Sequence, residues 1–277
     1  MSPTVRRPVI VQDAHARAAS RLSLLVPGAR SRQQLAEAQQ ENARLRRRLR
    51  QRGPRDDLGY LFVMTYGRSG STLLQGVLNS IPGYLIRGEN RQVLQHLHEF
   101  HIRAVNQRRS QRRAQRRQDR PVGGDATTHP FYGMDNFPVN KSLAGARRLA
   151  LDTLLRPGPD TRVTGFKEIR WADEEVADFV DWLRLVFPGA RFVVNTRDLA
   201  AVSRSKWWAE LPDADARLAT REQRILAVAD DLGDAAFRVH YDDYAGKPEA
   251  LAPLFEWLGE EFDEARVRAV MDVPHSY

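Results

Sequence analysis

A turn rich in glycine and hydroxyl residues in segment 61–74 has the residue types and spacing of an anion-binding loop. The segment, LFVMTYGRSGSTLL, begins as an apolar run, breaks at Gly67 and resumes as a helical pattern after Gly70. The glycines let the backbone curl around an anion, and the amides at a helix start can bind it. Arg68 adds a fixed positive charge. Hydroxyl donors follow at three positions, Ser69, Ser71 and Thr72. Together these residues predict a phosphate-binding loop between a strand and a helix.

The loop differs from the Walker A pattern GxxxxGK[ST] at two positions. Thr65 stands where the first glycine belongs, and Ser71 stands where the lysine belongs. These differences disfavour a metal-assisted nucleoside triphosphatase. A kinase that acts on a small metabolite is kept as an alternative interpretation.

A second candidate for phosphate binding lies in segment 191–208, RFVVNTRDLAAVSRSKWW. An apolar strand ends there at Asn195–Arg197, and a helical pattern follows. Arg197 precedes Ser205 by eight residues. Arginine suits phosphate because its planar fork can bond two oxygens at once and its charge persists at physiological pH.

These two segments resemble the sulfotransferases that use 3′-phosphoadenosine 5′-phosphosulfate (PAPS). GRSGSTLL after a strand resembles the family's 5′-phosphosulfate loop, which carries Lys or Arg where Arg68 stands. The interval from Arg197 to Ser205 is similar to that of the arginine and serine that bind the 3′-phosphate in the family. The resemblance covers about Leu58 to Gly259. It implies transfer of a sulfuryl group from PAPS to an acceptor hydroxyl, with no metal required.

Glu89, in the segment IPGYLIRGEN, is the candidate catalytic base. It follows Arg68 by twenty-one residues and resembles the glutamate base of the tyrosylprotein branch of the family, which lies at the same interval. A transferase that acts on hydroxyls needs a group that accepts the acceptor proton. The alternative is a surface ion pair with Arg87 or Arg91.

Two further site residues are expected at strand ends. Apolar residues alternate along segment 162–171, RVTGFKEIRW, and this pattern predicts a strand. Lys167 and Glu168 lie near its carboxyl end, where open α/β sheets bind ligands. Lys167 could steady the transferred group or orient the acceptor, or it could be a strand-edge charge. The resemblance places Tyr241, which precedes an acidic pair, near the adenine of PAPS. It implies a glycine-rich basic loop near the carboxyl terminus as well, and no counterpart is found before Tyr277.

The fold class predicted is α/β, a P-loop-like three-layer fold in which helices flank a central parallel sheet. Strands are expected near 60–65, 84–87, 162–167, 191–196 and 236–240. Helices are expected at 72–79, 91–117, 143–155, 174–186, 199–210, 220–232 and 247–258.

Charge is unevenly distributed along the chain. The net charge is +8, yet residues 1–120 contain 24 arginines and only 8 acidic residues. We expect a basic helical arm in 1–57, whose segment 33–52 carries a short heptad pattern, followed by a sulfotransferase domain in 58–277. The heptad segment could pair with a second copy as a homo-oligomer or lie on the catalytic domain.

An arginine-rich insertion is expected at about 101–120 within the domain. Eight arginines occur between Arg103 and Arg120. They could bind a polyanion or an anionic membrane surface, overhang the acceptor cleft, or form a solvated helix. The block contains no aromatic residue, which disfavours recognition of single-stranded nucleic acid.

Two further groups of residues lie downstream of Glu89. The loop that follows the insertion could line the acceptor pocket through His129, Phe131 and Tyr132, or it could be a packed surface loop. The spacing of His96, His98 and His101 suggests a partly exposed helix face, and no chemistry is assigned to them.

Composition excludes several classes of protein. There is no cysteine, so disulfides and thiolate metal sites are absent, and no apolar run is long enough for a membrane-spanning helix. The first residues lack the continuous apolar core of a secretory signal. We expect a cytoplasmic protein that could associate peripherally with a membrane surface. By family analogy the acceptor is a carbohydrate or glycolipid hydroxyl, and a non-catalytic basic scaffold is the remaining alternative.

Overall fold

The computed structural model of the protein describes residue 40 and residues 57–118, 127–171 and 175–273. The amino-terminal arm and its heptad segment 33–52 lie outside these residues, apart from Gln40. The described part contains a five-stranded sheet of order β2-β3-β1-β4-β5 in which every neighbouring pair is parallel. The strands are β1 Gly59–Met64, β2 Tyr84–Arg87, β3 Val163–Glu168, β4 Arg191–Thr196 and β5 Ala236–His240. This architecture confirms the predicted α/β class.

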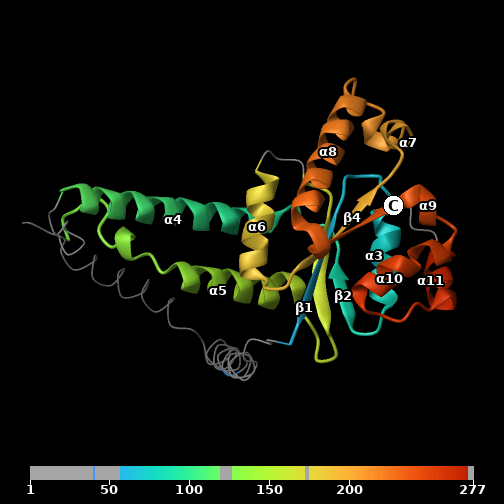
Figure 1. The fold of residues 1–277 in the computed structure, drawn as a ribbon, viewed down its shortest axis with the longest axis horizontal. Coiled ribbons are helices and arrows are strands. Elements are labelled where there is room, and N and C mark those ends of the chain that lie inside the picture. The colour runs from blue at the N-terminus through green and yellow to red at the C-terminus, as the bar shows by residue number, and fades with distance from the viewer. Residues whose placement is uncertain (1–39, 41–56, 119–126, 172–174, 274–277) are drawn as a thin grey trace, which may run out of the picture. The chain divides into compact units, whose positions relative to one another are not determined.

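Helices cover both faces of the sheet (Figure 1). One face packs against α5 Val139–Leu149, the π-helical turn Ala150–Leu155, α6 Val176–Val186 and α8 Ala214–Leu232. The other face packs against α3 Ser71–Ser80, α10 Ala252–Leu258 and α11 Glu264–Met271. Because β1 is central, its side chains alternate between two apolar layers, Phe62 in one and Val63 in the other. Such a strand has the near-continuous apolar sequence seen in segment 61–64.

The strand order brings the candidate site segments together. β1 pairs with β3 on one side and with β4 on the other. Met64, the last residue of β1, is opposite Glu168 of β3 and Val194 of β4. The chain segments that leave these three strands therefore meet at one edge, the carboxyl edge, where α/β sheets bind ligands.

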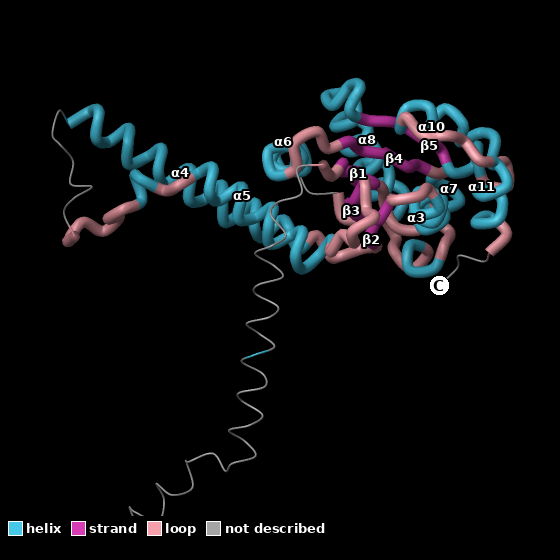
Figure 2. Tube along the Cα trace, turned by 90° about the horizontal axis from the view of Figure 1, so that it is seen from below, coloured by secondary structure: helices cyan, strands magenta, loops and turns pink. Residues whose placement is uncertain are grey.

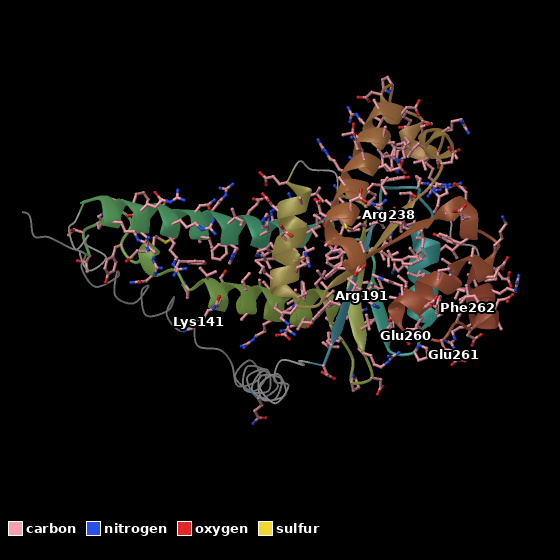
Figure 3. The ribbon with its side chains drawn as sticks, in the orientation of Figure 1. Lys141, Arg191, Arg238, Glu260, Glu261 and Phe262 are labelled. Atoms are coloured by element: carbon pink, nitrogen blue, oxygen red, sulfur yellow. The ribbon has the colours of Figure 1, made fainter. Side chains whose placement is uncertain are left out.

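The arginine-rich insertion forms most of one long helix, α4 Val93–Gln118. Its first half packs against α5 and α6, and its second half contacts the short 3₁₀ turn η2 Met134–Asn136. α4 and α5 run side by side and extend beyond the sheet (Figure 2). Lys141 of α5 is exposed (Figure 3).

The predicted helix 199–210 is interrupted. α7 Leu199–Ser203 ends early, Ser205 is extended (φ −101°, ψ 124°), and Lys206 has φ 48°. A 3₁₀ turn, η4 Lys206–Trp208, then completes the segment. The break turns Ser205 toward the loop after β1, where its hydroxyl contacts Arg68.

Three further short helical elements complete the described fold. They are η5 Gly233–Ala235, α9 Tyr241–Tyr244 and η6 Pro248–Leu251. Arg191, at the start of β4, donates to the carbonyls of Trp257 (2.7 Å) and Leu258 (3.1 Å) at the end of α10 (Figure 3). Cations at a helix carboxyl end satisfy carbonyls that lack an intrahelical partner, so this contact fixes α10 on the sheet. In the ranges that the model describes, no helix is long and apolar enough to cross a membrane.

Candidate active site

The candidate phosphate loop connects β1 to α3 through residues with positive φ. Arg68 has φ 71° and Gly70 has φ 76°, so the chain turns sharply before Ser71 opens the helix. Among the described residues, no side chain caps the amino terminus of α3, and its first turn contains no acidic residue. The amides at this end keep their capacity to bind an anion, which the helix dipole also favours.

A buried hydrogen-bond network fixes the loop. Thr65 Oγ1 donates to Asn195 O (2.7 Å) and lies 2.6 Å from Ser69 Oγ. Asn195 Nδ2 donates to Ser69 O (2.9 Å), and Tyr244 OH donates to Asn195 Oδ1 (2.8 Å). The Ser69 side chain is fully buried in this network. In this structure the Ser69 hydroxyl therefore shapes the loop, and its predicted contact with phosphate stays a prediction.

Arg68, Arg197 and Ser205 converge at this loop, as the two sequence segments suggested. Arg68 Nε donates to Ser205 Oγ (3.1 Å), and Arg197 Nη1 donates to the carbonyl of Arg68 (3.1 Å). The Tyr66 hydroxyl accepts from Arg197 N (2.8 Å) and donates to Glu222 Oε1 (2.8 Å). Burial raises the pKa of Tyr66 far above its ordinary value, so this donor stays protonated. Two cations and a hydroxyl thus meet beside the uncapped helix end.

Arg197 retains donor capacity for a ligand. Its Nε lies 3.8 Å from Asp242 Oδ1, too far for a hydrogen bond, and it is buried with no other partner among the described residues. Its guanidinium lies over the ring of Tyr241, 4.5 Å from the centroid. Stacking on an aromatic ring orients the planar fork.

Tyr241 also contacts the phosphate loop directly. A Cβ placed at Gly70 would lie 2.0 Å from the Tyr241 ring. Gly70 is therefore required twice, for its positive φ and for this close approach. The structure brings Tyr241 together with Gly70 and Arg197.

Glu89 and Lys167 form an ion pair at the same edge of the sheet. Lys167 Nζ lies 2.6 Å from Glu89 Oε1. The Lys167 side chain is 5% exposed, whereas that of Glu89 is 44% exposed. The competing surface pairs of Glu89 with Arg87 or Arg91 do not form. Arg87 instead donates to the carbonyl of Leu155 (2.8 Å).

The buried carboxylate of Glu168 positions the turn that carries Glu89. Glu168 Oε2 accepts from the amides of Asn90 (2.9 Å) and Gln92 (3.1 Å), and its Oε1 accepts from the amide of Ile169 (2.8 Å). Arg91 and Gln92 have φ values of 57° and 58°, which side chains other than glycine adopt at a cost. The sequence placed Glu168 near the site but did not indicate this positioning role.

Replacing Glu168 by glutamine should destabilise the protein by about 2 kcal/mol, because a buried NH₂ group would then face backbone amides that need an acceptor. The loss should be measured as a lower urea midpoint. The matched control is Glu256→Gln, at an exposed position of α10, which should change the urea midpoint little. A wild-type midpoint for Glu168→Gln would contradict the positioning role.

Trp207 is a candidate site residue that sequence analysis missed. Its side chain is 42% exposed, and its ring lies 4.2 Å from that of buried Trp208. Trp208 Nε1 donates to Gly67 O (3.1 Å), and a Cβ placed at Gly67 would lie 2.6 Å from Trp207. The loop glycine thus makes room for a partly exposed indole. The paired tryptophans directly after Ser205 are the signal that could have indicated it.

Two histidines of α4 are more buried than their spacing suggested. His98 and His101 are buried, not partly exposed. His98 packs on the rings of Phe179 and Trp182 of α6, and its Nε2 has no hydrogen-bond partner among the described residues. Burial lowers the pKa of His98 below its ordinary value of 6.5, although Asp178, Glu175 and Glu99 act in the opposite direction. Burial and the neighbouring His98 also lower the pKa of His101, whose Nδ1 lies 3.0 Å from Ser142 Oγ.

This burial predicts a pH-dependent stability. With a folded-state pKa below the unfolded value, the unfolded chain binds more protons in the interval between the two. The free energy of unfolding should therefore be greatest above pH 6.5 and should fall as the pH drops through that interval. Urea titrations across this range would measure the slope, and His98→Phe should reduce it. An equal slope in that variant would exclude His98 as a cause.

The loop expected to line the acceptor pocket lies against α4. Asp135, in the same turn as Phe131 and Tyr132, accepts at its carbonyl from Arg112 Nε (3.0 Å). Arg112 follows Val93 by nineteen residues, or about 28 Å along the helix. The loop thus packs on the second half of the arginine block, far along α4 from its start at Val93.

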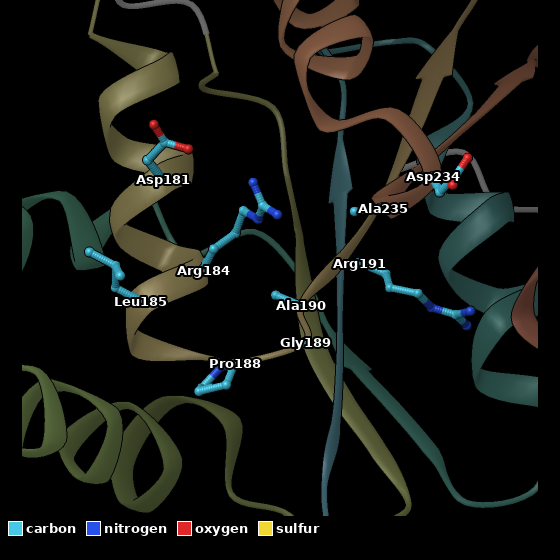
Figure 4. Close-up of a pocket in the computed structure, with 9 residues that line it drawn as sticks. All are labelled: Asp181, Arg184, Leu185, Pro188, Gly189, Ala190, Arg191, Asp234 and Ala235. Carbon is cyan, nitrogen blue, oxygen red and sulfur yellow. The ribbon is translucent and has the colours of Figure 1, made fainter.

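A surface hollow of about 830 Å³ lies at the opposite edge of the sheet (Figure 4). Arg191, the first residue of β4, lines it together with Arg184 and Asp234. It contains none of the predicted site residues, so we assign the chemistry to the carboxyl edge, where the loops converge. In the described residues no group of three or more His, Asp or Glu side chains is arranged to hold a metal ion.

Comparison with solved structures found matches at low identity. The sulfotransferase domain from the Synechococcus PCC 7002 olefin synthase shares 20% identity, with a TM-score of 0.45, over 77% of this chain and 78% of that one. Sulfotransferase STF9 from Mycobacterium avium shares 14% identity, with a TM-score of 0.40, over 78% of this chain and 67% of that one. A comparison with curated proteins found no match.

The family assignment comes from a family model that matches most of the domain. The model of the sulfotransferase family matches residues 61–264, which begin in β1 and end at the start of α11. The match therefore includes the phosphate loop, Glu89, Lys167, Arg197, Ser205 and Tyr241. The chain belongs to the sulfotransferase family.

Proposed function

We propose that the protein transfers the sulfuryl group of PAPS to an acceptor hydroxyl. The observation that carries the proposal is the convergence of Arg68, Arg197 and Ser205 beside the uncapped end of α3. The same edge of the sheet carries the Glu89–Lys167 pair. Transfer to a hydroxyl requires groups that bind the anionic donor and a group that accepts the acceptor proton, and a carboxylate can be the second.

The residues fit a donor that carries two separate phosphate groups. The amides of the loop, with Ser71 and Thr72 at the start of α3, would hold the 5′-phosphate, and Arg68 would neutralise its charge. Arg197 and Ser205 would hold the 3′-phosphate. Arg197 Nε supports this fit, since it has no hydrogen-bond partner among the described residues. Tyr241 would lie near the adenine.

In the proposed reaction the acceptor oxygen attacks the sulfur atom and a new O–S bond forms. The S–O bond to the 5′-phosphate breaks, and 3′-phosphoadenosine 5′-phosphate leaves. Glu89 would accept the proton of the acceptor hydroxyl, and Arg68 with the loop amides would stabilise charge on the leaving phosphate oxygen. Lys167 orients Glu89 and would be available to the transferred sulfuryl group.

We propose a carbohydrate ring, in a glycan or glycolipid, as the acceptor. Trp207 supports this choice, because it presents a partly exposed indole over Gly67, next to Arg68. The side chain of Ile169, two residues after Lys167, also comes within 3.5 Å of a Cβ placed at Gly67. A flat apolar surface beside charged groups suits a sugar, which has apolar faces and polar edges.

Trp207→Ala should raise KM for a glycoside acceptor about tenfold, on the order of 1.4 kcal/mol, and change kcat little, because it removes binding shared by the ground and transition states. The measurement is sulfate transfer at saturating donor. The control is Lys247→Ala, at an exposed residue to which no part in the proposed reaction is assigned. If a simple alcohol were used as well as glycosides, or if KM were unchanged, the acceptor assignment would be wrong.

Calorimetric titration with 3′-phosphoadenosine 5′-phosphate, compared with ATP and magnesium, tests the donor assignment. Tight binding of the bisphosphate alone is the expected result. Preference for ATP with magnesium would favour the small-metabolite kinase. Binding of neither ligand would favour the basic scaffold, for which Glu89 has no function.

A further inference from the structure

The second half of α4 carries a surface of arginine side chains that the proposed reaction does not use. Beyond Val105 no described residue of the helix is buried, and its only apolar residue there is Ala114. Residues four apart lie on the same side of a helix, so the arginines form two adjacent rows. One row contains Arg108, Arg112 and Arg116, and the other contains Arg109 and Arg113.

This arrangement is unfavourable for an isolated helix. Like charges four residues apart repel, and Arg108–Arg112, Arg112–Arg116 and Arg109–Arg113 are all such pairs. No ion pair to an acidic residue relieves them in the part of the chain that the structure describes. Arg109, Arg113 and Arg116 are exposed. A polar helix without compensating charges needs a partner, and the partner that its charge complements is an anionic surface.

Two exposed aromatic residues lie in the turn that packs against this half of α4. The turn before α5 packs on the second half of α4 through η2, and Arg112 Nε bonds the carbonyl of Asp135. In this turn Phe131 is 47% exposed and Tyr132 is 53% exposed. The arm tip, defined as residues 106–118 and 127–137, therefore combines exposed arginines with two exposed aromatic rings. The sequence did not indicate this combination, because the rings and the arginine block are separated along the chain.

We propose that the arm tip docks on an anionic membrane surface. Arginine rows attract the negative headgroups of a bilayer, and Phe and Tyr side chains insert at the boundary between headgroups and acyl chains. A single polyanion such as RNA would use the arginines equally well. It would not require two exposed aromatic residues in the turn that packs on the arginine-bearing half of α4. The bilayer is the partner that accounts for both features.

Sedimentation of the full-length protein with lipid vesicles tests the proposal. Vesicles of phosphatidylcholine mixed with phosphatidylglycerol should bind the protein, and pure phosphatidylcholine vesicles should not. The triple change Arg109→Gln, Arg113→Gln and Arg116→Gln should weaken partitioning on the order of 100-fold. The pair Phe131→Ser and Tyr132→Ser should weaken it about tenfold and make the residual binding more sensitive to salt.

A matched control separates the arm tip from general charge. Arg156→Gln, Arg184→Gln and Lys247→Gln remove three exposed cations from other surfaces, and this variant should bind vesicles nearly as the wild type does. Equal losses in the two triple variants would overturn the proposal, since net charge alone would then govern binding. Stronger binding to RNA than to vesicles, with no effect of the aromatic changes, would overturn it in favour of a nucleic-acid partner.

Discussion

Replacing Glu89 by glutamine should reduce sulfuryl transfer by about 10²–10⁴-fold, the range typical for loss of a positioned general base. Binding of 3′-phosphoadenosine 5′-phosphate should stay at the wild-type level. The glutamine carbonyl can still accept from Lys167 Nζ, which lies 2.6 Å from the carboxylate, so the geometry of the edge is preserved. What is lost is the ability to take the acceptor proton.

The measurement is steady-state transfer with calorimetric titration of the same preparation. Glu256→Gln, an equivalent change on the exposed surface of α10, should leave both unchanged. Wild-type turnover in the Glu89 variant would show that another group accepts the proton. Loss of bisphosphate binding as well would show that Glu89 supports the donor site and is not a dedicated base.

The positions of the strands could be predicted from the sequence because the physical signal is strong. Strands of a parallel sheet are buried on both faces and read as apolar runs, which is how segments 61–64 and 191–196 were assigned. Each run was followed by residues suited to phosphate, Arg68 in one case and Arg197 in the other. The sheet order then brought them together, as expected for the carboxyl ends of adjacent strands.

The contacts within the site could not be predicted, because they depend on tertiary partners. Ser69 was expected to bind phosphate, yet its hydroxyl is buried against Thr65. The helix expected to continue to Glu210 breaks at Ser205, where the hydroxyl meets Arg68 from a segment more than a hundred residues away. No local pattern contains this information.

The buried histidines show a signal that was present and misread. Leu94, His98, His101 and Val105 follow one another at intervals of four, three and four residues, and all are buried. That spacing is the apolar stripe of an amphipathic helix. A histidine on such a stripe packs as an aromatic residue, and His98 does so against Phe179 and Trp182.

The two arginines of the site should differ in which phosphate they bind. Truncating one partner of a hydrogen-bonded charge pair costs about 2–5 kcal/mol, so Arg68→Ala and Arg197→Ala should each weaken the binding of 3′-phosphoadenosine 5′-phosphate by about 30-fold or more. Adenosine 5′-monophosphate separates the two effects, because it lacks the 3′-phosphate. Arg68→Ala should weaken the binding of both ligands. Arg197→Ala should weaken chiefly the binding of the bisphosphate, so that its affinity no longer exceeds that of the monophosphate.

Arg197 also supports the loop through the carbonyl of Arg68, so its alanine variant needs a structural control. If loop support were its main role, Arg197→Ala would weaken the binding of the monophosphate as strongly as that of the bisphosphate. Arg197→Lys retains the charge but loses the planar fork, and it should give an intermediate loss confined to the bisphosphate. Arg184→Ala, at an exposed position of α6, should change neither affinity. If the Arg197 variants lost affinity equally for both ligands, Arg197 would not be the residue that binds the 3′-phosphate. Its role would then be to shape the loop.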